Sequence, residues 1–153
     1  MKKTVCIFVM VFSILLIVSF ALAEAEKWEI DKAHSNIYFD VRHTYATVRG
    51  QVDDLSVTVK YAPDNMTVSS VKSELKTKSI NTGMPNRDTH LRSEEFFAAN
   101  QYPFMIFEST GVKLKEGNQY TLVGNLTIKG KTNEMAVPLT YFGTRENLSL
   151  IHI

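Results

Sequence analysis

The sequence predicts an all-β fold, an antiparallel β-barrel with one short helical excursion. Hydrophobic and polar residues alternate with period two through most of the chain after residue 34, as in strands with one buried and one wetted face. Short glycine-containing loops join neighbouring runs, so those strands must be antiparallel. A long sheet of this kind avoids exposed edges best when it curls into a barrel.

The first 23 residues have the pattern of a secretory signal peptide. Lys2 and Lys3 precede an apolar run, and Ala21-Leu22-Ala23 supplies small residues at a signal peptidase site. We therefore divide the chain into a signal peptide over residues 1–23 and one exported domain over residues 24–153. The apolar run is long for a signal, so an uncleaved membrane anchor is the alternative.

The exported domain is nearly neutral. Removing residues 1–23 lowers the Lys and Arg count from 17 to 15 and leaves all 16 Asp and Glu residues, so the net charge is −1. This charge does not favour nucleic acid or an anionic membrane as a partner. The single cysteine, Cys6, lies in the signal, so burial must stabilise the domain without a disulfide.

Five runs show the alternation clearly and are the predicted strands. Turn sequences separate them, and two of these turns contain glycine. Pro138 lies inside the last run, and proline cannot donate a backbone hydrogen bond, so this strand is predicted to lie at an edge or a bulge. The predicted strands cover residues 35–42, 55–61, 71–78, 120–128 and 134–141.

Residues 81–103 interrupt the alternation and are predicted to form the helical excursion. Ser93 is the predicted N-cap, and two glutamates follow it in the first turn, where the helix dipole favours acidic side chains. Phe96 and Phe97 would anchor the helix to the sheet. Pro103 would end it.

A dense polar cluster lies at the start of this excursion: Arg87, Asp88 and His90. An Arg–Asp pair that clamps the excursion to the sheet is one interpretation. A contact between Arg87 or His90 and a ligand head group is a second, and catalysis is a third. Glycosidase chemistry is disfavoured because the acidic residues here have basic neighbours to pair with.

Two groups that contain histidine are candidates for chemistry. Asp31, His34 and Ser35 have the side-chain types of a hydrolytic triad, but consecutive strand residues point to opposite faces and no nucleophile elbow is present. His34, His43 and His90 offer zinc ligands without a closely spaced pair. The sequence therefore predicts no catalytic or metal-binding residue and no cofactor. A metal-dependent enzyme that uses these three histidines is kept as an alternative.

Three separated motifs, "WEIDKAHSNIYFDVRH", "NRDTHLRSEEFFAANQYPFMIFEST" and "GNLTIKGKT", together resemble the YceI-like family of polyisoprenoid-binding-like periplasmic proteins. The resemblance covers residues 28–142. It implies an extended, lipocalin-like antiparallel barrel of eight strands, a periplasmic location and often a homodimer. It implies no established enzymatic activity.

The resemblance also implies a ligand, a long-chain amphiphile such as a polyisoprenoid, an isoprenoid quinone or a fatty acid derivative. The expected function is that of a carrier or reservoir in transient contact with a membrane; a quinone-linked redox role is the alternative. Each CH₂ buried from the ligand's tail would contribute about 0.8 kcal/mol. The positions expected to line the slot are Phe39, Val57, Leu75, Phe97, Phe107, Leu122, Leu126 and Val137.

The C-terminus departs from the family pattern. Family members usually continue past the strand that ends near Gly143, whereas this chain has "RENLSLIHI" at its end. We expect the chain to be incomplete there, without the closing strands of the barrel. An incomplete barrel would have an exposed edge.

Overall fold

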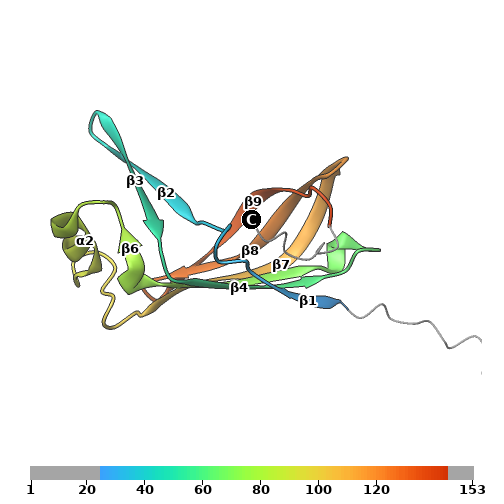
Figure 1. Cartoon of the computed structure of the whole chain (residues 1–153), viewed down its shortest axis with the longest axis horizontal. Helices are drawn as coiled ribbons and strands as arrows, with labels where there is room; N and C mark the ends of the chain where they lie inside the picture. The colour runs from blue at the N-terminus through green and yellow to red at the C-terminus, as the bar shows by residue number, and fades with distance from the viewer. Residues whose placement is uncertain (1–24, 145–153) are drawn as a thin grey trace, which may run out of the picture.

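The structure, a computed structural model, describes residues 25–144. They form nine strands, one α-helix and two short 3₁₀ helices, and each strand pairing is antiparallel (Figure 1). The all-β prediction is therefore confirmed. The predicted signal peptide and the predicted C-terminal truncation lie outside the described residues.

No helix within residues 25–144 is both long enough and apolar enough to cross a lipid bilayer.

Six strands form the main sheet, in the spatial order β1-β4-β5-β7-β8-β9. Tight turns join β7 to β8 and β8 to β9, as the glycine-containing loops predicted. The register of β7 against β8 shifts between Ser109 and Gly111 and again between Leu114 and Glu116, and such irregularities bend a strand. The strands are β1 (Glu26–Glu29), β4 (Leu55–Tyr61), β5 (Ser70–Lys76), β7 (Phe104–Glu116), β8 (Gln119–Ile128) and β9 (Lys131–Thr140).

A smaller sheet of three strands has the order β2-β3-β6. Its strands are β2 (Tyr38–His43), β3 (Ala46–Val52) and β6 (Ile80–Asn81). The β2–β3 hairpin rises away from the main sheet, close to the end where the helix α2 (Pro85–Arg92) lies (Figure 1). The 3₁₀ helices η1 (Met66–Val68) and η2 (Thr77–Ser79) flank β5.

The main sheet has one apolar and one polar face, as the alternation predicted. Antiparallel partners place their side chains on the same face. The register aligns Leu55 with Leu75 and Leu75 with Met105, and farther along the sheet Leu122 with Val137. We call this apolar side the inner face. Residues that alternate with them, such as Lys72 and Glu108, pair on the outer face.

The helical excursion is present, but its predicted boundaries were wrong. The helix covers Pro85–Arg92, and Ser93 is its C-cap rather than its N-cap. Pro85 occupies the first turn, where its missing N–H costs no hydrogen bond. The Ser93 backbone N–H donates to the His90 carbonyl, and the two glutamates that follow lie beyond the helix.

The two sheets do not close into a barrel within the described residues, because β2 and β9 each have one neighbour there. The Tyr141 N–H donates to the Asn118 carbonyl at 2.9 Å. Along an antiparallel ladder, hydrogen-bonded residue pairs alternate with pairs that are not hydrogen-bonded. Tyr141 is in a bonded pair, so Pro138, three residues earlier and opposite Thr121, is in a non-bonded pair and its nitrogen points away from β8. The edge position predicted from Pro138 is confirmed for this part of the chain.

Candidate functional site

Six of the eight positions predicted to line a ligand slot lie on the inner face, and the other two, Phe39 of β2 and Phe97 after α2, pack against its closed-end core. All eight side chains are buried or half-buried. Three pack against the core beside α2, and four belong to a second cluster on the main sheet. Val57 is half-buried between them, opposite Ser73. Their contact with a ligand stays a prediction. The first group is Phe39, Leu75 and Phe97; the second is Phe107, Leu122, Leu126 and Val137.

One end of the inner face is covered. The small sheet and the α2 segment pack onto the main sheet there, and Val52, Ile80 and Met105 are its buried centre. Ile80 is only 1% exposed. We call this region the closed end. Here the side chains of the two sheets fill the space between them.

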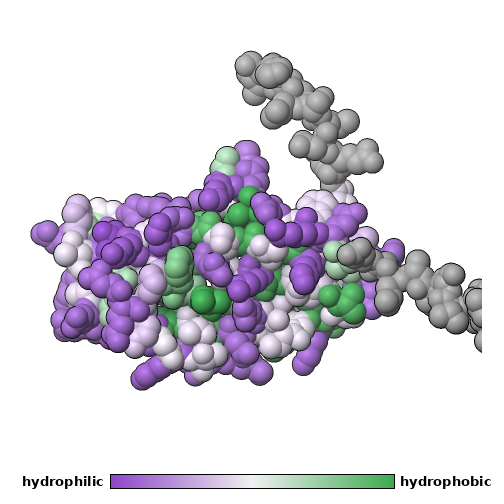
Figure 2. Space-filling view, turned by 90° about the horizontal axis from the view of Figure 1, so that it is seen from below, coloured by the Kyte–Doolittle hydropathy of each residue, from purple (hydrophilic) through white to green (hydrophobic). Residues whose placement is uncertain are grey.

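The opposite end of the inner face is not covered within the described residues. We call it the open end and define it by Trp28, Tyr61, Leu114, Tyr120 and Tyr141. The side chain of Leu114 is 59% exposed and that of Trp28 is 41% exposed. Large apolar side chains that are exposed together mark sites of ligand or partner binding. The underside of the molecule, shown in Figure 2, is mostly hydrophilic, with hydrophobic residues between the hydrophilic ones.

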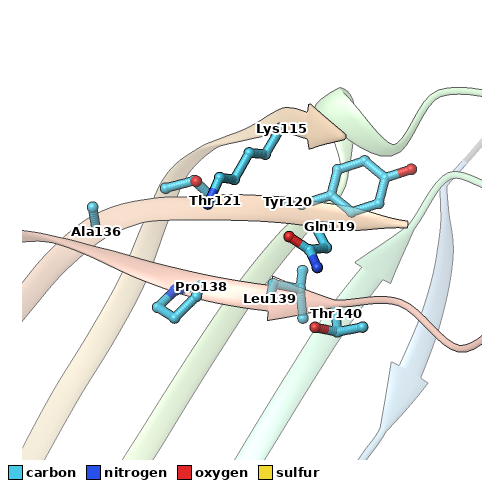
Figure 3. Close-up of a pocket in the computed structure, with 8 residues that line it drawn as sticks. All are labelled: Lys115, Gln119, Tyr120, Thr121, Ala136, Pro138, Leu139 and Thr140. Carbon is cyan, nitrogen blue, oxygen red and sulfur yellow. The ribbon is translucent and has the colours of Figure 1, made fainter. Parts of the chain in front are cut away.

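A shallow depression lies at the ends of β7, β8 and β9, beside the open end (Figure 3). Tyr120 pairs with Leu139 on the inner face. Thr121 and Pro138, which pair next to them, lie on the outer face. Most of the lining residues share the outer face with Thr121 and Pro138, so the depression belongs mainly to the outer side of the sheet. Its lining residues are Lys115, Gln119, Tyr120, Thr121, Ala136, Pro138, Leu139 and Thr140.

Three aromatic rings span the open end from β1 to the end of β9. The rings of Trp28 and Tyr61 meet edge to face with centroids 5.7 Å apart, and those of Tyr61 and Tyr141 are 5.8 Å apart. The hydroxyl groups of Tyr61 and Tyr141 hydrogen-bond to each other. Because β5, β7 and β8 separate these strands in the sheet, the contact requires a strongly curled sheet. Figure 1 shows β7 and β8 rising away from β4 at this end.

This aromatic row was not among the predicted site residues. Alternation had already placed Tyr61 and Tyr141 on the apolar side of their strands. Their meeting was not visible in the sequence, because it depends on how far the sheet curls. The register shifts in β7 contribute to that curl.

The Arg87–Asp88 group binds a residue that sequence reasoning missed, Thr82. The Asp88 carboxylate is 6% exposed and accepts hydrogen bonds from the Thr82 N–H at 2.9 Å and the Thr82 hydroxyl at 2.6 Å. Arg87 donates to the same hydroxyl at 2.7 Å and to the Thr82 carbonyl at 2.9 Å. The two charged side chains are thus joined through Thr82 rather than by a direct bond. This arrangement holds the start of α2 against the segment that follows β6.

The environment of Asp88 favours its ionised form. Burial alone would raise the pKa of the Asp88 carboxyl. The hydrogen bonds from Thr82 and the positive charges of Arg92 and Arg87 outweigh burial, so the pKa lies below its usual value. Arg92 also donates to the Ile80 carbonyl at 2.6 Å. These contacts attach the excursion to β6.

His90 takes part in a different contact. Its Nε2 lies 2.9 Å from the Glu95 carboxylate, and its ring packs edge to face on Phe96 with centroids 4.7 Å apart. The imidazole is more than half exposed. His90 therefore joins α2 to the turn that follows it, and it does not reach the Arg87–Asp88–Thr82 group through any bond in the described structure.

The histidines proposed from the sequence as metal ligands or triad members also lie in separate local contacts. His34 Nδ1 lies 2.8 Å from the Asp31 carboxylate, and the other oxygen of Asp31 accepts from the Ala33 N–H. The hydrogen bond from His34, followed by that from Ala33, lowers the pKa of Asp31. Within residues 25–144, no three His, Cys, Asp or Glu side chains are placed to share a metal ion. His34, His43 and His90 thus do not form one site there.

Comparisons with known proteins agree with this fold. Residues 28–151 match the YceI-like domain family. Protein YceI of Salmonella newport is 33% identical over 124 residues, which are 79% of this chain and 64% of that protein. The chain thus spans less than two thirds of the length of that relative.

Two solved structures are similar to this one. BcnA of Burkholderia cenocepacia superposes with a TM-score of 0.73 at 26% identity, covering 76% of this chain and 73% of BcnA. A polyisoprenoid binding domain from Saccharophagus degradans gives a TM-score of 0.51 at 14% identity, covering 75% of this chain and 62% of that domain. The second likeness is one of fold. The family match and the fold together make this chain a member of the YceI-like domain family.

Proposed function

We propose that this chain is a binding protein for a long-chain amphiphile and that it acts as a carrier or reservoir. The observation that carries the proposal is the inner face, which carries apolar side chains from all six strands and runs from the closed end to the open end. A flexible apolar tail laid along it would exchange water contact for side-chain contact at about 25 cal/mol per Å² of apolar surface buried. Such binding needs few polar contacts.

The comparisons support this class of ligand. The chain belongs to the YceI-like domain family, and the neighbour from Saccharophagus degradans is described as polyisoprenoid binding. We infer that the tail bound here is an isoprenoid or acyl chain. An isoprenoid quinone falls within this class as a ligand.

Binding rather than catalysis is supported by the polar groups of the described residues. Asp88 and Arg87 are satisfied by Thr82, and His34 by Asp31. Both groups make local contacts of a structural kind. The alternative of a metal-dependent enzyme needs His34, His43 and His90 together, and the described fold does not bring them together.

We further propose export to the periplasm, on the basis of the N-terminal sequence. Cell fractionation would test this, with release by osmotic shock as the expected outcome and retention in the membrane fraction as the outcome for an anchor. The homodimer and the transient membrane contact stay predictions.

Native mass spectrometry of the purified full chain, with organic extraction of bound material, tests the proposed function. We expect a hydrophobic adduct in stoichiometric amount. A matched pair of variants on β9 supplies the control: Val137→Gln changes a half-buried residue on the inner face, and Ala136→Gln changes its exposed neighbour on the outer face. The adduct should be reduced in the first and kept in the second. A folded protein without an adduct, and with no uptake of added lipid, would contradict the proposal.

A further inference from the structure

The hydroxyl pair of Tyr61 and Tyr141 is the strongest unassigned polar feature of the inner face. We propose that it receives the polar end of the bound amphiphile, and that this end is an uncharged oxygen group such as an alcohol or a quinone carbonyl. The tail would then run from the open end toward the closed end. This inference rests on the proposed function and specifies the head group and the orientation of the ligand.

The geometry leaves one hydrogen-bond donor free. Each tyrosine hydroxyl has one O–H to donate and two lone pairs. In the contact between Tyr61 and Tyr141, one O–H donates to the other hydroxyl, and the second O–H stays free to donate. No other side chain among residues 25–144 bonds these two hydroxyls. A ligand oxygen placed beside them would accept that remaining hydrogen bond.

The donor is present at any physiological pH. The hydrogen bond between the two hydroxyls raises the pKa of Tyr61 to about 12, with smaller contributions from burial and from the neighbouring Tyr141, Tyr120 and Asp64. Tyr61 is therefore a neutral phenol under physiological conditions. It therefore brings no negative charge to the pair, and one of the two hydroxyls keeps a proton to donate.

The charged side chains around the pair disfavour an anionic head group. Glu26 pairs with Tyr61 in the register of β1 and β4 and so lies on the same face, where it accepts from the Trp28 indole N–H at 3.2 Å. Asp64 follows in the turn after β4 and acts on Tyr61 electrostatically. Lys27 follows Glu26 and Lys60 precedes Tyr61 along their strands, so these two basic residues pair on the opposite, outer face. A diphosphate or a carboxylate here would face like charges.

The closed end does not suit a polar group. Val52, Ile80 and Met105 are buried there against other apolar side chains. A polar group placed among them without a partner would lose its hydrogen bonds to water. The two ends of the inner face thus differ in a way that orients an amphiphile.

The chain contains its own reporter for this site. Trp28 is its single tryptophan, and its ring contacts Tyr61. Delipidated full chain should be titrated with geranylgeraniol and with geranylgeranyl diphosphate, which share a tail and differ in the head group. We expect the alcohol to bind more tightly than the diphosphate and to change the fluorescence of Trp28.

Two variants remove only the hydroxyl groups, Tyr61→Phe and Tyr141→Phe. Each should weaken binding of the alcohol by about fivefold to tenfold, the usual effect of one lost hydrogen bond. Tyr45→Phe is the control, because Tyr45 lies wholly exposed at the tip of the β2–β3 hairpin. Circular dichroism checks the fold of each. If a variant does not fold, the comparison of the two ligands on the unmodified chain decides.

The outcomes separate this inference from the proposed function. Equal binding of the alcohol to the unmodified chain and both variants would overturn the inference and leave the proposed function standing. Tighter binding of the diphosphate would do the same. Binding of neither ligand, with no change at Trp28, would overturn both.

Discussion

The closed end and the open end share one sheet and one pattern of alternation, yet they bury very different fractions of their apolar side chains. Met105 and Leu114 both lie on β7, and Met105 at the closed end is 6% exposed whereas Leu114 at the open end is 59% exposed. The difference comes from what lies across the inner face. The small sheet and the α2 segment cover one end, and aromatic rings span the other. Stability and ligand binding are thus expected to depend on different ends of the same face.

Truncating one side chain at each end should test this division most strongly. Ile80→Ala removes buried methyl groups from a packed region and should lower the free energy of unfolding by about 2–5 kcal/mol. Leu114→Ala removes exposed atoms and should change it by about 0.5 kcal/mol or less. Urea denaturation followed by circular dichroism gives both values. Similar losses in the two variants would show that the open end is as well packed as the closed end.

A pair of glycines sharpens the comparison within the main sheet. A Cβ on Gly124 would lie 2.6 Å from the Glu108 carbonyl oxygen and 2.6 Å from the Phe107 ring, so the backbone would have to move. Gly124→Ala should therefore cost about 1–3 kcal/mol of stability. Gly111 has nothing within 4 Å of such a Cβ.

Gly111→Ala serves as the matched control for Gly124→Ala and should be close to neutral. Thermal unfolding of the two variants side by side gives the result. A destabilised Gly111→Ala with an unchanged Gly124→Ala would mean that the close contact of β7 with β8 does not limit packing there.

The group around Asp88 should show the smallest of these effects, and one that depends on pH. Asp88→Asn keeps the shape of the side chain and removes its charge, so it should lower stability by about 1–2 kcal/mol at neutral pH without altering ligand binding. Because the folded-state pKa is depressed, the stabilisation by Asp88 is present above the unfolded-state pKa of about 3.9. It is lost as the pH falls through the folded-state pKa.

Melting temperatures of Asp88→Asn and the unmodified chain, measured from pH 7 down to pH 3, test this sign. The difference between them should shrink as the solution becomes acidic. A difference that grows at low pH, or lost lipid binding at unchanged stability, would instead place Asp88 in the ligand site.

Much of the fold could be predicted because period two and turn chemistry are local signals. The runs that became β4, β5, β8 and β9 were visible in the sequence, and Pro138 placed β9 at an edge. The strands β1, β3, β6 and β7 lay outside the five predicted runs, and β3 shows one reason. The turn before it contains Thr44 with φ of 48°, and a β-branched residue in this conformation gives no glycine or asparagine signal for a hairpin.

The error in the helix has a similar local cause. Ser93 is a good N-cap by residue type, and the two acidic residues after it strengthened that interpretation. Pro85 lies where the strand pattern breaks, and proline is also common in the first turn of a helix. Both signals were present, and only the tertiary contacts of Thr82 and Ile80 with this segment distinguish them.

One part of the candidate site could likewise be predicted from the sequence and another part could not. Its lining positions follow from alternation, so they could be named in advance. The contact between Tyr61 and Tyr141 joins residues 80 positions apart across three intervening strands. It depends on sheet curvature, which no run of neighbouring residues encodes. The role of Thr82 likewise depends on where the helix begins.

The outward-facing nitrogen of Pro138 also bears on how this protein behaves at high concentration. An unpaired edge strand can act as a template for strands of other molecules and so start fibrils. A strand added to β9 would find no N–H at position 138 and would meet the pyrrolidine ring instead. Ordered stacking along the second half of β9 is thereby discouraged. Within the described residues, Pro138 thus makes the free edge of β9 a poorer template for amyloid-like assembly.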